Sequence, residues 1–99
     1  MSQRIVVHGG ATATIYSYDS PVVPTDAPLL TAQNYGPDEI TVTTYWGAPY
    51  LDGGWHVLGS CTIPAGTQQD LYVGDSAFFH FKADATNNGS QDTEVGYSM

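Results

Sequence analysis

The sequence predicts an all-β domain, folded as a two-sheet antiparallel β-sandwich of the immunoglobulin-like or jelly-roll kind with about eight strands. The first observation is that apolar and polar residues alternate along Ile40–Trp46, as in a strand with one buried face. The second is the stretch Thr62–Thr67, where Pro64 cannot donate to a ladder and Gly66 can take a positive φ, so that a strand ends and the chain turns. The third is that no segment repeats apolar residues at helical spacing over several turns.

Short apolar runs in the first half of the chain are predicted to form strands at Ile5–His8, Ala11–Ser17, Leu29–Gln33 and Ile40–Trp46. Gly9 and Gly10 predict a two-residue hairpin turn between the first two of these strands. Prolines without any periodicity fill Asp19–Pro28, so we expect a surface connection that crosses from one sheet to the other.

The second half continues the pattern after a predicted loop at Gly47–Gly54. Strands are expected at Trp55–Ile63, Gln69–Val73, Ala77–Ala85 and Thr93–Ser98, with a strong turn signal at Asn87–Ser90. Residues of one parity in these strands should face inward, and Phe78 should lie on the opposite face. The predicted core contains Trp55, Val57, Ile63, Leu71, Phe79 and Phe81.

Length and composition indicate one domain, residues 1–99, with few charged side chains. Lys and Arg number 2 against 10 Asp and Glu, which gives a net charge of -8 and disfavours nucleic acid or an anionic membrane as partner. Charged residues make up only 12% of the chain, and neutral polar surfaces lose little energy when another subunit buries them. Cys61 is the single cysteine, and the N-terminus lacks an apolar signal run, so we expect a soluble chain made without export.

Candidate chemistry is sparse in this sequence. His8, His56 and His80 invite a metal hypothesis, but only the last two share the outward parity, and no pair has ligand spacing. Ser60 lacks the elbow motif of a nucleophilic serine, and Asp92 with Glu94 lies near a terminus with no cleft implied. We therefore expect no catalytic residue, no metal and no cofactor.

Aromatic residues on outward parity or in turns are the remaining signal. Tyrosine and phenylalanine on a surface with little charge are favoured anchors of protein interfaces, although the same rings can stack on a sugar. Scattered aromatic residues without a partner are the plain alternative. The interface candidates are Tyr45, Tyr50, Tyr72 and Phe78.

The turn Thr62–Thr67, with Leu71–Asp75 after it and Ile40–Tyr45 before it, resembles small β-sandwich structural proteins of tailed bacteriophage virions. Those proteins are head decoration (cement) or tail and neck accessory subunits. The resemblance implies a non-enzymatic subunit of a virion, synthesised in the host cytoplasm, that stabilises an assembly by contacts with copies of itself and with a larger capsid or tail protein. It also implies a homo-oligomer within the assembly. A carbohydrate- or receptor-binding β-sandwich module is the alternative.

Overall fold

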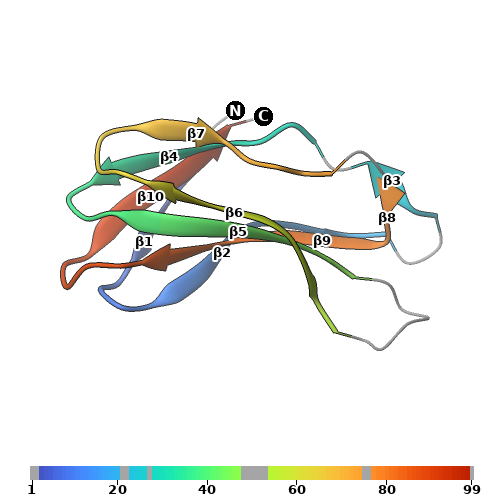
Figure 1. The fold of residues 1–99 in the computed structure, drawn as a ribbon, viewed down its shortest axis with the longest axis horizontal. Helices are drawn as coiled ribbons and strands as arrows, with labels where there is room; N and C mark the ends of the chain where they lie inside the picture. The colour runs from blue at the N-terminus through green and yellow to red at the C-terminus, as the bar shows by residue number, and fades with distance from the viewer. Residues whose placement is uncertain (1–2, 21–22, 27, 48–53, 75–76, 99) are drawn as a thin grey trace.

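The chain forms strands throughout the part that the computed structural model describes, which is residues 3–20, 23–26, 28–47, 54–74 and 77–98. The ten strands are β1 (Gln3–Val7), β2 (Thr12–Asp19), β3 (Thr25–Asp26), β4 (Thr31–Gly36), β5 (Ile40–Gly47), β6 (His56–Ile63), β7 (Gln68–Asp70), β8 (Ala77–Phe78), β9 (His80–Asn87) and β10 (Thr93–Ser98). No helix among these residues is long and apolar enough to span a bilayer. The predicted all-β class is confirmed (Figure 1).

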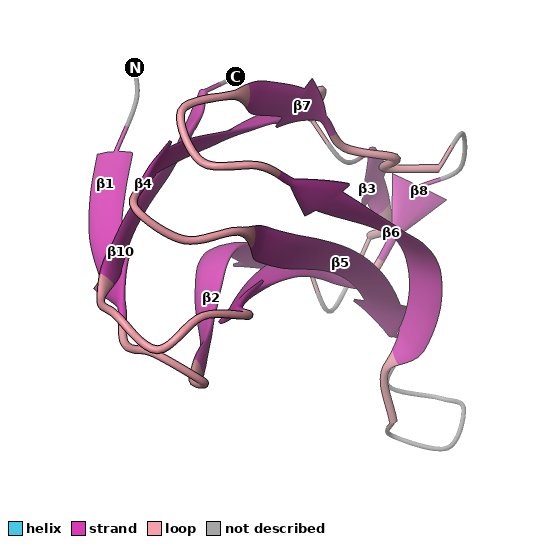
Figure 2. Ribbon diagram, turned by 60° about the vertical axis from the view of Figure 1, so that its left-hand side comes forward, coloured by secondary structure: helices cyan, strands magenta, loops and turns pink. Residues whose placement is uncertain are grey.

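The strands form two four-stranded antiparallel sheets and one two-stranded ribbon. The first sheet has the order β1-β10-β4-β7, the second β2-β9-β5-β6, and the ribbon joins β3 to β8 beside them (Figure 2). The pairing is nested, because β1 pairs with β10, β2 with β9, β3 with β8, β4 with β7 and β5 with β6. This rolled arrangement is the jelly-roll form of the β-sandwich.

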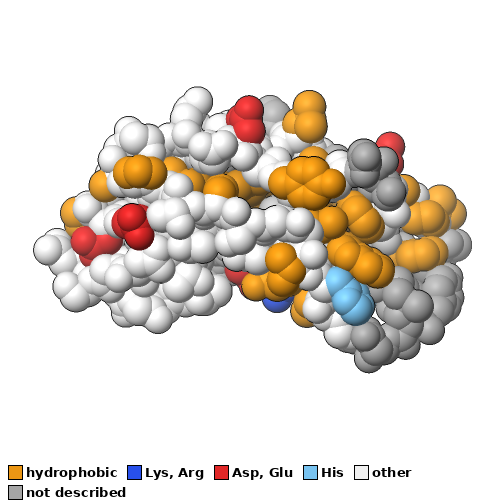
Figure 3. All heavy atoms as spheres, in the orientation of Figure 1, with side chains coloured by type: hydrophobic (Ala, Val, Ile, Leu, Met, Phe, Trp, Pro, Cys, Tyr) orange, Lys and Arg blue, Asp and Glu red, His pale blue; other side chains and the backbone are white. Residues whose placement is uncertain are grey.

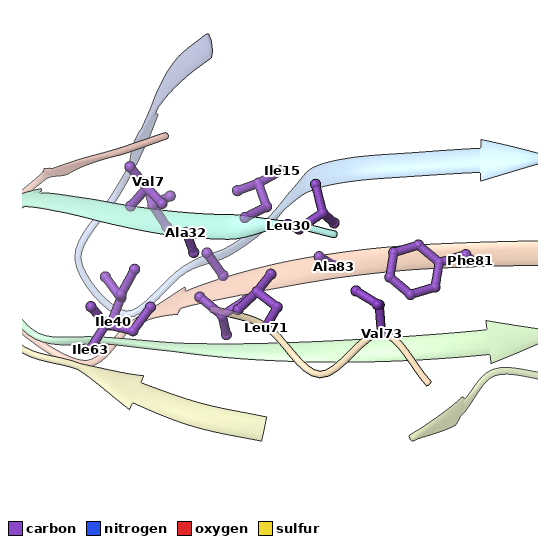
Figure 4. Close-up of a cluster of buried hydrophobic side chains, with 13 residues drawn as sticks. Val7, Ile15, Leu30, Ala32, Ile40, Ile63, Leu71, Val73, Phe81 and Ala83 are labelled. Atoms are coloured by element: carbon purple, nitrogen blue, oxygen red, sulfur yellow. The ribbon is translucent and has the colours of Figure 1, made fainter. Parts of the chain in front are cut away.

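The hydrophobic core lies between the two four-stranded sheets (Figure 4). Ile63, Leu71 and Phe81 are buried in it, so the core prediction is confirmed for these residues. Ala83 and Ala85 are also fully buried in β9, and such small side chains let the facing residues approach closely. The complete cluster is Val7, Ile15, Leu30, Ala32, Ile40, Val42, Ile63, Leu71, Val73, Phe81, Ala83, Ala85 and Val95.

The predicted hairpin between the first two strands is wrong, because β1 and β2 belong to different sheets. The backbone N–H of Gly10 donates to the carbonyl of Asn87 at the end of β9 (3.1 Å), and the N–H of Ala11 donates to the carbonyl of His8 (2.9 Å). The turn therefore passes the chain across the sandwich instead of folding it back on itself. The predicted crossing at Asp19–Pro28 is confirmed, since it leads from β2 in one sheet to β4 in the other.

The core assignments of Trp55 and Val57 are wrong, because their side chains are 46% and 63% exposed. A β-bulge explains the error. The register between β6 and β5 skips Leu58, so that Val57 and Gly59 pair with successive residues of β5. An extra residue reverses the side-chain parity on one side of the bulge. The residues before Leu58 that simple alternation assigns to the core consequently face outward.

The core assignment of Phe79 is also wrong, because this residue is only partly buried and does not belong to the buried cluster. The predicted continuous strand Ala77–Ala85 is broken at Phe79 into β8 and β9, which pair in different sheets. Parity does not carry across such a break. Phe78 is the neighbour that packs against the core, on its half-buried side.

A buried asparagine joins the two sheets near the end of β4. The Oδ1 atom of Asn34 accepts the N–H of Gly36 (2.9 Å). Its Nδ2 group donates to the carbonyl of Asp38 (2.8 Å) and, in the opposite sheet, to the carbonyl of Ile63 (2.9 Å). One side chain thus closes its own turn and fixes the end of β6 to the end of β4.

Asn87 repeats this arrangement at the end of β9. Its Oδ1 atom accepts the N–H of Gly89 (2.9 Å), and its Nδ2 group donates to the carbonyls of Gln91 (2.6 Å) and Val7 (2.9 Å). Val7 belongs to β1 in the opposite sheet. Both asparagines are almost fully buried with their amide groups satisfied, which is the condition for a buried polar group to stabilise a fold.

Replacement of Phe81 by alanine is expected to lower the free energy of unfolding by about 3–5 kcal/mol, because a fully buried ring leaves a cavity. Replacement of the partly buried Phe79 is the control and should cost clearly less. Urea denaturation followed by far-ultraviolet circular dichroism measures both variants. Equal losses would contradict the assignment of Phe81 to the core.

Replacement of Asn87 by alanine is expected to destabilise the fold by about 1–3 kcal/mol for each buried backbone group that loses its partner. The carbonyl of Val7 is one such group. Asn88→Ala is the matched control, because Asn88 is exposed and its amide contacts only surface groups, the Glu39 carboxylate and the Thr41 hydroxyl. Both variants can be compared by urea denaturation, and an Asn87 variant as stable as the Asn88 variant would refute the role of Asn87 in joining the two sheets.

Candidate interaction surface

Large apolar side chains are exposed along the first half of β6 and on the segment that follows β7. Tyr72 is 60% exposed where its segment packs against Gly59 of β6, and the exposed Trp55 and Val57 and the half-buried Leu58 come just before Gly59 in the chain. We call these four residues the β6 surface. Figure 3 shows larger hydrophobic groups gathered over this half of the molecule than over the opposite half.

Two glycines make room for this surface. A Cβ atom at Gly59 would lie 3.1 Å from the Cβ of Tyr72, so the missing side chain lets Tyr72 lie against the strand. A Cβ at Gly74 would lie 2.9 Å from Phe78 and 3.5 Å from Leu58, and Gly74 has a φ of 75° that residues with a side chain rarely adopt. Glycine inside a strand often marks such a close approach.

A stack of rings lies on the inward side at the start of β6. Trp46 stacks on His56 with 4.5 Å between ring centroids, and on its other neighbour Phe78 with 6.0 Å. Phe78 is also packed against the core. These rings therefore fill the inward side at the start of β6, whereas Trp55 and Val57 face outward.

Lys82 lies on the outer face of the second sheet, next to this surface. Its ammonium group is 5.0 Å from the ring centroid of Tyr45 and 4.8 Å from that of Trp55. It also forms an ion pair with Asp84 (3.1 Å), whose other oxygen accepts the hydroxyl of Thr14 (2.7 Å). The ammonium group is thus held in one place by a carboxylate and two rings.

Arg4, the other basic residue of the chain, is held in the same way on the first sheet. Its guanidinium group forms an ion pair with Glu94 (2.9 Å) and lies 3.8 Å from the ring centroid of Tyr35. The hydrogen bond to Glu94 is the main cause that raises the pKa of Arg4 above its ordinary value. Both cations are therefore neutralised within the domain.

The structure separates the aromatic residues that the sequence singled out as interface candidates. Tyr72 lies on the β6 surface, and Phe78 lies half-buried beneath it. Tyr45 is half-buried on the outer face, opposite Val57 and next to Lys82. Tyr50 lies outside the described residues.

Sequence reasoning missed Trp55 and Val57, because it placed both in the core. Gly59 was the available signal: an isolated glycine within a strand pattern indicates a bulge or a close approach.

A cavity of about 110 Å³ opens between β6 and β7, beside the β6 surface. Its lining consists of Val42, Thr44, Gly59, Ser60, Cys61, Asp70, Leu71 and Tyr72. The hydroxyl of Thr44 donates to the carbonyl of Tyr72 (2.7 Å), which fixes the chain at the mouth of the cavity. Burial raises the pKa of the Cys61 thiol in its wall.

The residues weighed for catalysis and metal binding lie apart. His8 contacts Asp92 (3.0 Å), His80 contacts Asp19, and His56 is stacked on Trp46. The bulge in β6 also corrects the predicted outward parity of His56, which pairs opposite the inward residue Trp46. Across the described ranges, no three His, Cys, Asp or Glu side chains gather into a group that could hold a metal ion.

The other weighed groups have separate partners as well. The hydroxyl of Ser60 shares a hydrogen bond with that of Thr43 (3.1 Å), and Glu94 is paired with Arg4.

No protein-family model matches this chain, and no curated protein does. The chain is similar to a solved structure described as the crystal structure of PirA, with a TM-score of 0.88 and 27% sequence identity. The likeness covers 97% of this chain and 90% of that chain, so the two share the sandwich over nearly their whole length. The name PirA states no ligand, partner or reaction. The resemblance to phage structural proteins stays a prediction, since none of these three comparisons tests it.

The Cys61 thiol is expected to react with iodoacetamide more slowly in the folded chain than in the urea-unfolded chain at the same pH. Only the thiolate attacks, and the raised pKa lowers the thiolate fraction below that of an ordinary cysteine. The rate for the folded chain should therefore still rise at pH values where the unfolded chain has reached its plateau. Mass spectrometry of alkylation against pH measures this, and superimposable profiles would contradict a buried thiol.

Proposed function

We propose that this domain is a non-enzymatic binding subunit that joins a larger protein assembly through the β6 surface. The observation that carries the proposal is the exposure of Tyr72 (60%), Val57 (63%) and Trp55 (46%) around the first part of the edge strand β6. Contiguous exposed apolar patches on a small soluble domain mark interaction sites, and tyrosine and tryptophan are common hot-spot residues.

The charge distribution supports contact with protein rather than with nucleic acid. Both basic residues are engaged by a carboxylate and an aromatic ring, so neither is available to a phosphate without breaking these contacts. β6 itself carries no Asp, Glu, Lys or Arg, and its burial would cost little in lost hydration of charge.

The identity of the assembly rests on the sequence resemblance alone. A phage virion, with this chain as a head decoration, tail or neck subunit bound to copies of itself and to a larger capsid or tail protein, is the assembly that the resemblance suggests. The exposed apolar surface is compatible with that role, and it is equally suited to any stable protein complex.

One arrangement favours carbohydrate binding as a second candidate function. Tyr45 and Trp55 lie on one face with the polar groups of Lys82 and Asp84 between and beside them. Aromatic rings flanked by polar groups are suited to sugars. The ammonium group already lies over both rings, however, so a sugar would have to displace Lys82 before it could stack.

Sedimentation of the tagged chain, alone and after mixing with the large protein complexes of its source, tests the assembly role. The chain should sediment with a protein complex, and Tyr72→Ala should weaken this binding about thirtyfold, as for a hot spot worth about 2 kcal/mol. Tyr35→Ala is the matched control, since Tyr35 is an exposed tyrosine on the other sheet. The role is refuted if Tyr72→Ala and Tyr35→Ala bind alike, or if the chain binds only a defined glycan.

A further inference from the structure

β6 is an edge strand whose sequence contains no Asp, Glu, Lys or Arg. It stands at the end of its sheet, and within the described residues it pairs with β5 alone. The bulge at Leu58 leaves Gly59–Ile63 in regular register with Ile40–Thr44. This segment contains no charged residue and no proline, which are the usual devices that protect a strand edge from pairing.

The other edge strands of the two sheets each carry such a device. β7 has only three residues, all exposed, and includes Asp70. β1 holds the ion-paired Arg4, and β2 is interrupted by an irregular register at Ile15 and ends in Asp19. Gly59–Ile63 is the stretch of edge that such features leave unprotected.

The cavity between β6 and β7 lies where an added strand would place a side chain. Side chains directly opposite each other on neighbouring strands point to the same face of a sheet. A residue opposite Gly59 or Cys61 would therefore point inward, toward the cavity that both residues line. The cavity measures about 110 Å³, with Val42, Leu71 and Tyr72 in its wall, which suits one aliphatic side chain. An engineered apolar cavity of roughly 150 Å³ holds benzene.

Charge decides which kind of chain can supply that strand. A second copy would bring a net charge of -8 against the same charge, and the inward residues of its own Gly59–Ile63 are Gly59, Cys61 and Ile63, which is already buried in its own core. Asp70 stands in the cavity lining with an exposed side chain, and its carboxylate accepts the hydroxyl of Thr31 (2.7 Å). A basic residue beside the aliphatic one would complement it.

We propose that an extended segment of a different, basic protein adds to β6 as a further strand along Gly59–Ile63. Its backbone pairs with the edge, one aliphatic side chain enters the cavity, and a lysine or arginine lies near Asp70. Strand addition of this kind takes affinity from main-chain hydrogen bonds and specificity from pockets for alternate side chains. This inference rests on the proposed function and names the mode by which the partner is held.

The test uses the full chain labelled with ¹⁵N and a synthetic capped peptide, Lys-Thr-Val-Thr-Val-Thr-Lys, which presents valine on one face and lysine at its ends. Saturable chemical-shift changes and slowed hydrogen exchange are expected at the amides of Gly59–Ile63, with no change along β2. A peptide N-methylated along its pairing edge cannot donate hydrogen bonds and should not bind. A peptide with glutamate in place of lysine should bind more weakly.

Variants locate the site on the chain. Ser60→Lys places a like charge on the edge and should weaken binding of the lysine peptide severalfold or more. Ser17→Lys is the matched control, because it changes an exposed serine on β2, the other edge of the same sheet, and should leave binding unchanged. Asp70→Asn should weaken binding about two- to fivefold, the range of an exposed ion pair. Unchanged amide spectra away from each substitution show that the variants fold.

Several outcomes would overturn the inference. Shifts confined to Val57, Trp55 and Tyr45 without protection of Gly59–Ile63 would mean that peptides bind the outer face, which leaves the assembly role intact. Absence of binding at millimolar peptide, or equal effects of Ser60→Lys and Ser17→Lys, would refute strand addition. Concentration-dependent pairing of β6 with β6 without peptide would make a second copy the occupant. Failure of the assembly role itself is distinct, because it shows in sedimentation as loss of any dependence on Tyr72.

Discussion

The nested pairing of strands is the constraint on which the rest of this structure depends. β5 and β6 form the innermost pair, and each later strand pairs with a strand that precedes β5 in the chain. The chain therefore crosses between sheets at most of its connections. The same nesting sends β6 and β7 to the ends of their sheets, where they face each other across the cavity. The open edge of β6 is therefore a consequence of topology, and its side chains determine which partner can pair with it.

The two ends of the sandwich are held together by different physical means. At one end Asn34 and Asn87 bind carbonyl groups of the opposite sheet, so the sheets are joined by satisfied buried hydrogen bonds. The first half of β6 lies toward the other end, where Trp46, His56 and Phe78 stack (Figure 1). Hydrogen bonds fix a geometry, whereas stacked rings mainly exclude water. The end packed with rings is consequently the one that can present apolar surface.

Much of this fold could be predicted from periodicity and turn chemistry, because both are local. Alternation along Ile40–Trp46 and the turn at Pro64 led to the correct class, and the prolines after Asp19 led to the correct crossing. The errors arose where a local pattern meets a distant partner. Two glycines can turn a hairpin or a crossover equally well, and only the bond between Gly10 and Asn87 decides. A bulge at Leu58 likewise depends on the register of β5, which the sequence of β6 does not contain. The exposure of Trp55 and Val57 could not be predicted from the sequence for that reason.

The net charge of -8 and the apolar β6 surface are best understood together. An exposed tyrosine, tryptophan and valine on a small domain favour self-association, and an uncharged strand edge favours it further. Ten acidic residues against two neutralised basic ones act in the opposite direction, because like charge keeps copies of the chain apart before short-range contacts can form. The repulsion is long-range and not specific to a site, so it leaves the surface open to a partner that is neutral or basic. Repulsion between like charges can therefore oppose self-association of a chain whose strand edge is uncharged. Charge selects the partner at long range, and shape selects it only at contact.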